Sequence, residues 1–292
     1  MHGRLALSST STAMAENEGV ARKGSLIVLG AAGGIGRALT GTLLKRGMKV
    51  LAVDRDGALL ETLPRNGGFL ETRELDITDR SGVSGFAAAL ARDGRLFDGL
   101  VTTAGIHSTH PVQHLPDELV DRVLDVNLAA HIKLVRDFLP LMKDGGSIIG
   151  VSSIAACVGV PMSSLYSASK RGLEGFYESL FTEVRHRRIR VSVIHPGNVN
   201  TGFNETGNTY RATGGSFIDT RYTRVVERID SRHGIPPEHV AQVIAKVLSN
   251  RRPRFCYVVG GNARKANWAL KILGRDLAIR LMGRFFGFQV SP

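Results

Sequence analysis

Cysteine is scarce in this sequence, which has only Cys157 and Cys256 among its 292 residues. Two cysteines cannot form the disulfide framework of a small secreted domain, and their scarcity fits a reducing compartment. Cys157 follows a predicted strand, so we expect its thiol to pack in the interior rather than to act as a nucleophile. The cysteine content therefore favours a cytoplasmic protein.

Long apolar runs are missing as well. No stretch approaches the roughly 18 uninterrupted apolar residues of a membrane span. Residues 1–23 mix Ser, Thr, Ala and charge without the apolar centre of a secretory signal, and we expect a flexible tail there. With 43% hydrophobic and 22% charged residues, the chain is typical of a soluble globular protein, long enough for one large α/β domain or two small ones.

Seven short apolar runs alternate with segments of helical pattern. In several runs the residues at both odd and even positions are hydrophobic, so neither face of these strands would lie in water. This indicates a parallel sheet covered by helices on both faces. The predicted strands span 26–29, 50–53, 69–75, 100–103, 147–151, 191–194 and 255–259, and the predicted helices span 35–46, 81–92, 116–142 and 163–187. We therefore predict a single doubly wound α/β domain of the Rossmann type, with a mostly parallel seven-stranded sheet, over residues 24–261.

A glycine-rich turn follows the first predicted strand, in Gly30-Ala-Ala-Gly-Gly34-Ile-Gly36-Arg37. Such glycines let the backbone approach a pyrophosphate at the amino end of the next helix, where free N–H groups favour an anion. Asp54 ends the second strand, where its carboxylate would accept both ribose hydroxyls and repel a 2′-phosphate. NAD is therefore the preferred cofactor, with NADP as the alternative because Arg37 or Arg55 could bind its phosphate.

Tyr166 and Lys170 are four residues apart, a spacing that puts both side chains on one face of a helix. A phenol has a pKa near about 10, so proton transfer near neutral pH requires a neighbouring cation that favours the phenolate. Lys170 is suited to be that cation. The same spacing occurs by chance on many solvated helices, so the rest of the chain must decide.

The motifs together resemble those of the short-chain dehydrogenase/reductase family. The matching elements, in family order between residues 25 and 202, are Gly30-x-x-x-Gly34-x-Gly36, Asp54, Asp76, Thr102-Thr-Ala-Gly105, Asn127, Ser153, Tyr166-x-x-x-Lys170 and Pro196-Gly-Asn-Val-Asn-Thr201. Two positions depart from the family pattern. Leu29 stands where Thr is common, and Thr102-Thr103 stand where the family commonly has Asn-Asn.

The resemblance implies a role for each catalytic residue. Tyr166 would be the general acid/base, Ser153 would hydrogen-bond the substrate oxygen, and Lys170 would lower the tyrosine pKa and bind the nicotinamide ribose. Asn127 would bind a water that links Lys170 to solvent, with helix capping or a core hydrogen bond as the alternatives. Asp76 would lie near the adenine edge or cap a loop. The implied cofactor-binding residues are Gly30, Gly34, Ile35, Gly36, Asp54, Arg55, Asp76, Ile77, Ala104, Gly105, Tyr166, Lys170, Pro196, Gly197, Val199 and Thr201.

Four histidines, His107, His110, His114 and His195, lack the close spacing of metal ligands, and no carboxylate cluster accompanies them in the sequence. We expect loop or surface histidines and no metal centre.

Two segments after the catalytic motif concern the substrate. Residues 198–234 break the strand and helix rhythm and begin where a strand ends, so we expect a substrate lid. Residues 154–162 are almost wholly apolar and would line a pocket for a lipophilic alcohol or ketone, such as a steroid, a retinoid or a long-chain alcohol. Simple packing of residues 154–162 under a loop is an equal alternative.

The formal charge of +12 is concentrated near the carboxyl end, where residues 251–292 hold nine Lys or Arg and one acid. In residues 262–292, apolar and basic side chains alternate as in an amphipathic helix that lies in a membrane interface. A helix docked on its own domain or on a partner subunit is the alternative. No nucleic-acid motif is present, and the family resemblance implies homodimers or homotetramers built on the long helices after residues 116 and 163.

Three function classes follow from these observations. The first is an NAD(H)-dependent alcohol dehydrogenase or carbonyl reductase acting on a hydrophobic substrate, in the cytoplasm or at the membrane surface. The second is an NADPH-dependent 3-oxoacyl reductase of the fatty-acid type. The third is a non-enzymatic nucleotide sensor, which would have no reason to carry Asn127, Ser153, Tyr166 and Lys170 together.

Overall fold

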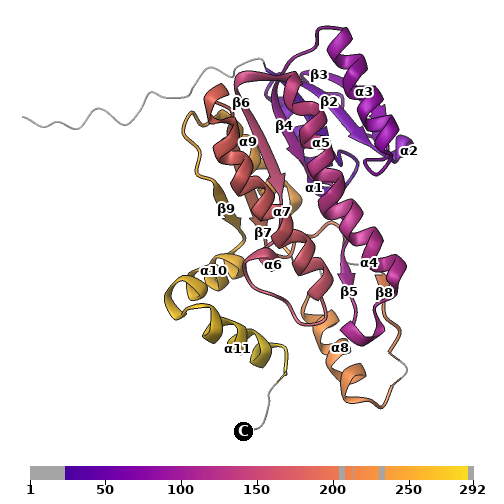
Figure 1. Cartoon of the computed structure of the whole chain (residues 1–292), viewed down its shortest axis with the longest axis vertical. Coiled ribbons are helices and arrows are strands. Elements are labelled where there is room, and N and C mark those ends of the chain that lie inside the picture. The colour runs from indigo at the N-terminus through magenta and orange to yellow at the C-terminus, as the bar shows by residue number, and fades with distance from the viewer. Residues whose placement is uncertain (1–23, 204–207, 213, 230–233, 289–292) are drawn as a thin grey trace, which may run out of the picture.

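The computed structural model of the chain describes residues 24–203, 208–212, 214–229 and 234–288, so the predicted tail 1–23 lies outside the described residues. Its centre is a parallel sheet of seven strands in the order β3-β2-β1-β4-β6-β7-β9 (Figure 1). The strands are β1 Ser25–Leu29, β2 Lys49–Asp54, β3 Phe69–Glu74, β4 Phe97–Thr102, β6 Met142–Val151, β7 Arg190–Pro196 and β9 Cys256–Val259. The predicted doubly wound, seven-stranded fold is confirmed.

Both faces of the sheet are buried because each carries its own layer of helices. On one face, Leu90, Leu134 and Leu173 pack from α3 Arg80–Arg92, α5 Ala130–Phe138 and α7 Ser164–Glu183. On the other face, Leu39 and Ile244 pack from α1 Gly34–Lys45 and α9 Pro237–Ser249. A strand covered on both sides needs apolar residues at every position, which explains the continuous apolar runs in the sequence.

The segment predicted as one helix over 116–142 is interrupted. It consists of α4 Asp117–Leu124, a π-helical turn Asp125–Ala129, α5 and a 3-10 turn Leu139–Leu141. The π turn carries Asn127, whose buried side chain bonds the backbone of Ile106. π turns inside α-helices are frequent at functional sites. In this one, the side-chain amide of Asn127 reaches the loop that follows β4.

Residues of the predicted lid form two short elements in the described part of 198–234. The strand β8 Asn208–Thr209 pairs with β5 Ser108–Thr109 in a separate two-stranded sheet, and α8 spans Phe217–Arg228. Tyr222 and Val225 of α8 pack in one apolar cluster with Met162 and Phe286. The lid segment therefore rests on the loop that follows β6 and its short helix, and on the carboxyl end of the described chain.

The carboxyl-terminal segment forms two helices instead of the single one predicted, α10 Gly261–Leu273 and α11 Arg275–Phe285. Gly274, with φ of 76°, separates them, because a left-handed residue ends a helix. The shorter helices α2 Gly57–Glu61 and α6 Ile154–Cys157 complete the α-helices of the described residues, which also include 3-10 turns at Val112–His114 and Val184–Arg187. In Figure 1, α8, α10 and α11 lie beyond the ends toward which the arrows of β6, β7 and β9 point. No helix in the described ranges is long and apolar enough to cross a membrane.

Candidate active site

A cavity of about 570 Å³ lies at the carboxyl ends of the strands. In open α/β sheets, ligands bind at this edge, where the strand order reverses. The cavity brings together every predicted cofactor and catalytic residue except Asn127, which lies just behind its wall. Its lining includes Gly30, Gly34, Ile35, Gly36, Asp54, Arg55, Asp76, Ile77, Ala104, Gly105, Ser153, Tyr166, Lys170, Pro196, Gly197, Val199 and Thr201.

The glycine-rich turn is shaped by close backbone approaches. Gly30 has φ of 81°, and a Cβ at this position would lie 2.5 Å from the amide nitrogen of Ala104. Gly36 packs against the carbonyl of Gly30, so it also has no room for a side chain. The Thr103 hydroxyl lies 3.0 Å from the Leu29 carbonyl oxygen and 2.9 Å from that of Gly30. Thr103, which departs from the family pattern, thus still joins β4 to the turn.

The amino end of α1 opens into this cavity and fits a pyrophosphate. Gly33 precedes the helix, no side chain caps its first turn, and no acidic residue lies there. The first N–H groups of a helix have no intrahelical acceptor, and the helix dipole favours an anion beside them. Thr201 packs directly against Gly34 at the start of this helix and also lines the cavity. The residues present therefore match a dinucleotide cofactor.

Asp54, the residue predicted to bind the ribose, lines another part of the cavity. Its Oδ2 accepts a hydrogen bond of 3.0 Å from the Ala32 amide, which ties the glycine-rich turn to β2. The guanidinium of Arg37 is bonded to the hydroxyl of Thr62 at 2.7 Å and to its carbonyl. Arg55 is exposed and lines the cavity. Arg37 is therefore engaged by Thr62, whereas the Arg55 side chain faces the cavity.

Asp76 also lines the cavity, and its carboxylate caps a turn. Oδ1 accepts hydrogen bonds from the amide of Thr78 at 2.8 Å and from its hydroxyl at 2.7 Å. Asp76 therefore caps a loop, which was one of its two predicted roles, and it also lies at the cavity.

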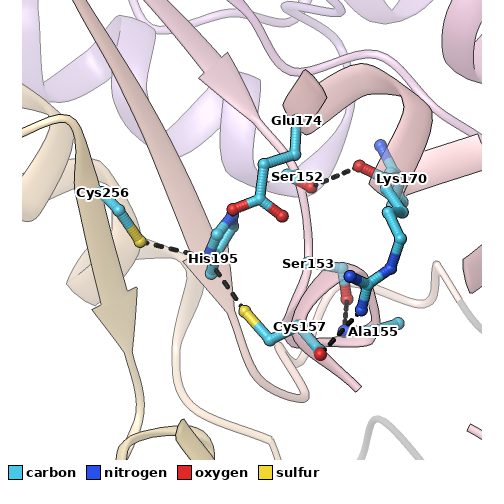
Figure 2. Close-up of polar contacts among 9 residues, drawn as sticks. Ser152, Ser153, Ala155, Cys157, Lys170, Glu174, His195 and Cys256 are labelled. Atoms are coloured by element: carbon cyan, nitrogen blue, oxygen red, sulfur yellow. Dashed lines mark hydrogen bonds and ion pairs between the residues drawn. The ribbon is translucent and has the colours of Figure 1, made fainter. Parts of the chain in front are cut away.

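Tyr166 and Lys170 lie on α7, where they are 7% and 3% exposed. The Lys170 Nζ donates to the Val151 carbonyl at 3.3 Å and lies 5.8 Å from the centroid of the Tyr166 ring. Ser153, at the end of β6, caps α6 through a 3.1 Å bond from the Ala155 amide to its hydroxyl oxygen (Figure 2). The segment after β6 and one turn of α7 thus hold all three side chains at the cavity wall.

Burial shifts the pKa values of both Tyr166 and Lys170. Burial raises the pKa of Tyr166 to about 12, and a hydrogen bond with Ser153 acts in the opposite direction. Burial also lowers the pKa of Lys170 to about 8. Desolvation of the phenolate is thus the main influence on the Tyr166 pKa, and the lowering of that pKa by Lys170 stays a prediction.

Asn127 makes core hydrogen bonds. Its Oδ1 accepts from the Ile106 amide at 2.8 Å, and its Nδ2 donates to the Ile106 carbonyl at 2.9 Å and to the Ser169 hydroxyl at 3.1 Å. These bonds fasten the turn after β4 to α7. The core alternative to a water-binding role is therefore present in the structure.

Sequence reasoning missed His107. Its ring lies 4.7 Å from the Tyr166 ring and 6.0 Å from the Phe203 ring, measured between centroids, and its Nε2 is 2.7 Å from the Thr109 hydroxyl. Burial, with the charge of Lys170, lowers its pKa to about 4, so the imidazole is neutral near pH 7. The sequence offered one signal for this role. His107 follows the Thr102-Thr-Ala-Gly105 motif by two residues, and that motif begins at the last residue of β4.

The expectation of loop or surface histidines holds for His107 and His110, which lie in loops, and for the exposed His114, and it is wrong for His195. His107, His110 and His195 are buried, and His195 has no exposed surface because it lies within β7, between β6 and the edge strand β9. Cys157 packs against His195, and burial raises the pKa of its thiol to about 12. Such a thiol is a poor nucleophile, in line with the expected packing role.

Comparison with known proteins agrees with this geometry. The short chain dehydrogenase family profile matches residues 25–211. Human 17-beta-hydroxysteroid dehydrogenase type 1 is 32% identical over 80% of this chain and 76% of its own length. The 3-ketodihydrosphingosine reductase of Bacteroides thetaiotaomicron is 27% identical over 80% of this chain and 87% of its own.

Solved structures of short-chain dehydrogenases have the same fold. One from Streptomyces avermitilis superposes with a TM-score of 0.77 at 25% identity, covering 92% of this chain and 99% of its own. Another, from Burkholderia cenocepacia in complex with NADP, has a TM-score of 0.71 at 26% identity, covering 89% and 98%. The chain belongs to the short-chain dehydrogenase/reductase family, and it is an NAD(P)-dependent oxidoreductase.

Proposed function

We propose that the protein interconverts a secondary alcohol and a ketone, or an alcohol and an aldehyde, on a hydrophobic substrate such as a steroid, a retinoid or a long-chain alcohol. The observation that carries the proposal is the position of the buried Tyr166 hydroxyl beside Ser153, in the wall of an otherwise largely apolar part of the cavity. Ile106, Ile154, Val160, Phe203 and Ile229 line this part. The named substrates of the human steroid and bacterial sphingoid relatives support a lipophilic substrate.

In this proposal each side chain has one task. Hydride transfer is the chemistry that a nicotinamide cofactor would supply when bound in the cavity. Tyr166 moves the proton at the substrate oxygen, Ser153 donates a hydrogen bond to that oxygen, and Lys170 provides positive charge and a donor at the ribose. Asn127 positions the turn after β4 and α7 through its bonds to Ile106 and Ser169.

Only some of the aromatic residues in the predicted lid, residues 198–234, line the cavity. Phe203 lines the cavity, but Tyr222 packs away from it against Met162, and Phe217 is exposed. In 154–162, Ile154 and Val160 line the cavity, whereas Met162 packs under α8. We propose that residues 198–234 cover the substrate and that their described part is held by the apolar contacts of α8.

A substrate screen tests this function. Hydrophobic alcohols and ketones, together with 3-oxoacyl thioesters, are followed at the reduced-nicotinamide absorbance with both cofactors. Tyr166→Phe should keep cofactor affinity and lose about 100-fold to 10,000-fold in turnover, the usual contribution of a general acid/base. Tyr257→Phe, in β9 and outside the cavity lining, is the matched control. Turnover of Tyr166→Phe near the wild-type rate contradicts the proposal, and preference for 3-oxoacyl thioesters favours the fatty-acid alternative.

We propose NAD as the preferred cofactor. Asp54 presents a carboxylate where a 2′-phosphate would lie, and Arg37 is already bonded to Thr62. Arg55 is the residue that favours NADP, and three solved relatives contain NADP or a derivative of it. Asp54 would repel the 2′-phosphate of NADP, and Arg55 would attract it. We expect the repulsion to be the stronger effect, because the hydrogen bond from the Ala32 amide holds the Asp54 carboxylate in place.

We also propose peripheral contact with anionic membranes through α10 and α11. Their exposed apolar side chains include Trp268, Ile272, Ile279 and Phe285, and exposed Lys and Arg lie among them. Aromatic and apolar side chains beside basic ones bind the headgroup region, where each basic residue contributes about 1 kcal/mol. Phe286 of the same segment packs with the lid residue Tyr222, so membrane contact would lie next to the predicted lid.

Liposome sedimentation tests the membrane contact. The wild type should sediment with anionic vesicles, and Trp268→Ser with Ile272→Ser should reduce the bound fraction at least about 10-fold. Phe69→Ser is the control, because Phe69 is equally exposed on the edge strand β3. Absence of the wild type from the vesicle pellet excludes membrane contact.

We propose a homodimer or homotetramer built on α4, α5 and α7, the helices that the family resemblance implicates. Ile132 of α5 is an exposed apolar residue on this surface. Light scattering of the purified chain measures the assembly, and Ile132→Glu should shift it toward the monomer.

A further inference from the structure

Two arginines of α8 converge on one point of the carboxyl-terminal segment. Arg221 and Arg224 are three residues apart in this helix, so their side chains leave the same face. A Cβ built on Gly287 would lie 2.7 Å from the Nη1 of Arg221 and 2.5 Å from the Nη1 of Arg224. The two nitrogens are therefore no farther apart than the sum of these two distances. Tyr222 of the same helix packs in one apolar cluster with Phe286, which follows α11 (Figure 1).

These two positive charges have no acidic partner within the described residues. No carboxylate there forms an ion pair with Arg221 or Arg224, and neither guanidinium is in a hydrogen bond. Asp219, the buried acid of α8, accepts a hydrogen bond of 3.1 Å from the Tyr210 hydroxyl. The Nε of Arg221 is buried and has no hydrogen-bond partner in the described part of the chain. Two like charges this close repel each other, and a buried donor without an acceptor is costly, so an anion held by both guanidinium groups would stabilise the arrangement.

We propose that Arg221 and Arg224 bind a phosphate group, supplied by the headgroup of an anionic membrane lipid. A guanidinium presents a planar fork of N–H donors that matches the oxygens of a phosphate. Aromatic rings flank the site. The Cζ of Arg221 lies 4.8 Å from the centroid of the exposed Phe217 ring. Further along α8, the Cζ of Arg228 lies 4.3 Å from the centroid of the exposed Phe285 ring. Exposed aromatic residues beside basic ones are typical of the headgroup level of a membrane.

The site rests on the membrane contact that we propose for α10 and α11, and it extends that surface to α8. Neither arginine lines the cofactor cavity, so the site is separate from the reaction centre. Ile229, which directly follows α8, does line the cavity. A lipid phosphate bound by Arg221 and Arg224 would thus fix the helix of the proposed lid against the carboxyl-terminal segment.

Calorimetric titration of the full-length chain with soluble phosphates tests the site. The probes are inorganic phosphate and monomeric dihexanoyl phosphatidic acid, and dihexanoyl phosphatidylcholine, whose headgroup has no net charge, is the comparison lipid. We expect one phosphatidic acid per chain, bound at least about 10-fold more tightly than either of the other two. The phosphate supplies the charge for the guanidinium groups, and the acyl chains add contact with apolar side chains. Equal affinity for inorganic phosphate overturns the lipid source.

Paired substitutions locate the binding. Arg221→Gln with Arg224→Gln should weaken phosphatidic acid binding at least about 10-fold, because charge-assisted hydrogen bonds are lost. Arg224→Gln alone, at an exposed position, should weaken it at least about 3-fold. Arg251→Gln with Arg252→Gln is the matched control, because it also removes two exposed arginines, and these precede β9 at the end of the sheet away from the cavity. The control should bind phosphatidic acid like the wild type.

The proposal is overturned if the wild type binds no phosphatidic acid, or if the control loses as much affinity as the paired Arg221 and Arg224 variant, since the effect would then be one of net charge. Trp268→Ser with Ile272→Ser should still bind monomeric phosphatidic acid, so the titration separates the phosphate site from the membrane contact of α10. None of these titrations needs a substrate, and failure of the proposed oxidoreductase activity leaves them unaffected.

Discussion

The imidazole of His107 packs against the phenol of Tyr166, with 4.7 Å between the ring centroids. The contact couples the end of β4 to α7 within the wall of the cavity. Since the pKa of His107 is lowered to about 4, the ring acts near neutral pH as a neutral aromatic surface with one hydrogen bond, to Thr109.

Replacement of His107 should therefore affect substrate more than cofactor. Aromatic contacts of this kind contribute about 0.5–1.5 kcal/mol, so His107→Ala should lower kcat/KM for a hydrophobic substrate about 2-fold to 10-fold, mainly through KM. Above pH 5, the wild-type and variant pH profiles should have the same shape. His186→Ala is the exposed control, and a larger change in cofactor Kd than in substrate KM would contradict a substrate-side role.

Lys170 should reduce the free energy of unfolding near neutral pH. Burial lowers its pKa from 10.5 to about 8, so between these values the unfolded chain holds a proton that the folded chain has lost. Stability then rises with pH through this window, and the cost is complete below about pH 8. Lys170→Met should be more stable than the wild type at pH 7, by roughly 3 kcal/mol at most.

The stability difference should shrink as the pH approaches 10.5. Urea unfolding at pH 7, 9 and 10.5 measures it, with the exposed Lys246→Met as the control for loss of a charge. A difference that is independent of pH would mean that Lys170 is not the titrating group.

Asp54 should control the choice between the two cofactors. Asp54→Asn keeps an oxygen that can accept from the Ala32 amide but removes the negative charge that repels a 2′-phosphate. The variant should bind NADPH at least about 10-fold more tightly than the wild type and NADH a few-fold more weakly, whereas Arg55→Ala should weaken NADPH. Fluorescence titration gives both constants. Tighter binding of NADPH than NADH by the wild type would overturn the NAD preference.

Gly36 should tolerate no side chain. A Cβ there would overlap the Gly30 carbonyl, so Gly36→Ala should destabilise the protein by about 1–3 kcal/mol or more and abolish cofactor binding. Gly85→Ala in α3 is the matched control, since its Cβ would have no neighbour within 4 Å. It should stabilise the protein by roughly 0.5–1 kcal/mol. Thermal unfolding with and without cofactor distinguishes the two, and equal behaviour would contradict the packing argument.

Much of the fold could be read from the chain because each signal is local. Leu26–Leu29 and Ser147–Val151 are apolar at nearly every position, which only a strand covered on both faces requires. The breaks within 116–142 and at Gly274 were missed. A π turn at Asn127 depends on hydrogen bonds to Ile106, which is distant in sequence, and an isolated glycine in a helical pattern is often tolerated.

The sequence by itself determined the family motifs, the parallel sheet and the identity of the groups at the cofactor edge, because these depend on spacing within single elements. Only the tertiary structure decided that burial raises the Tyr166 pKa, that His107 joins the cavity wall, and that Cys157, Glu174 and Cys256 contact His195. Desolvation and side-chain clusters depend on what lies alongside a residue in space. The adjacency of β6, β7 and β9 creates that environment, and no local pattern encodes it.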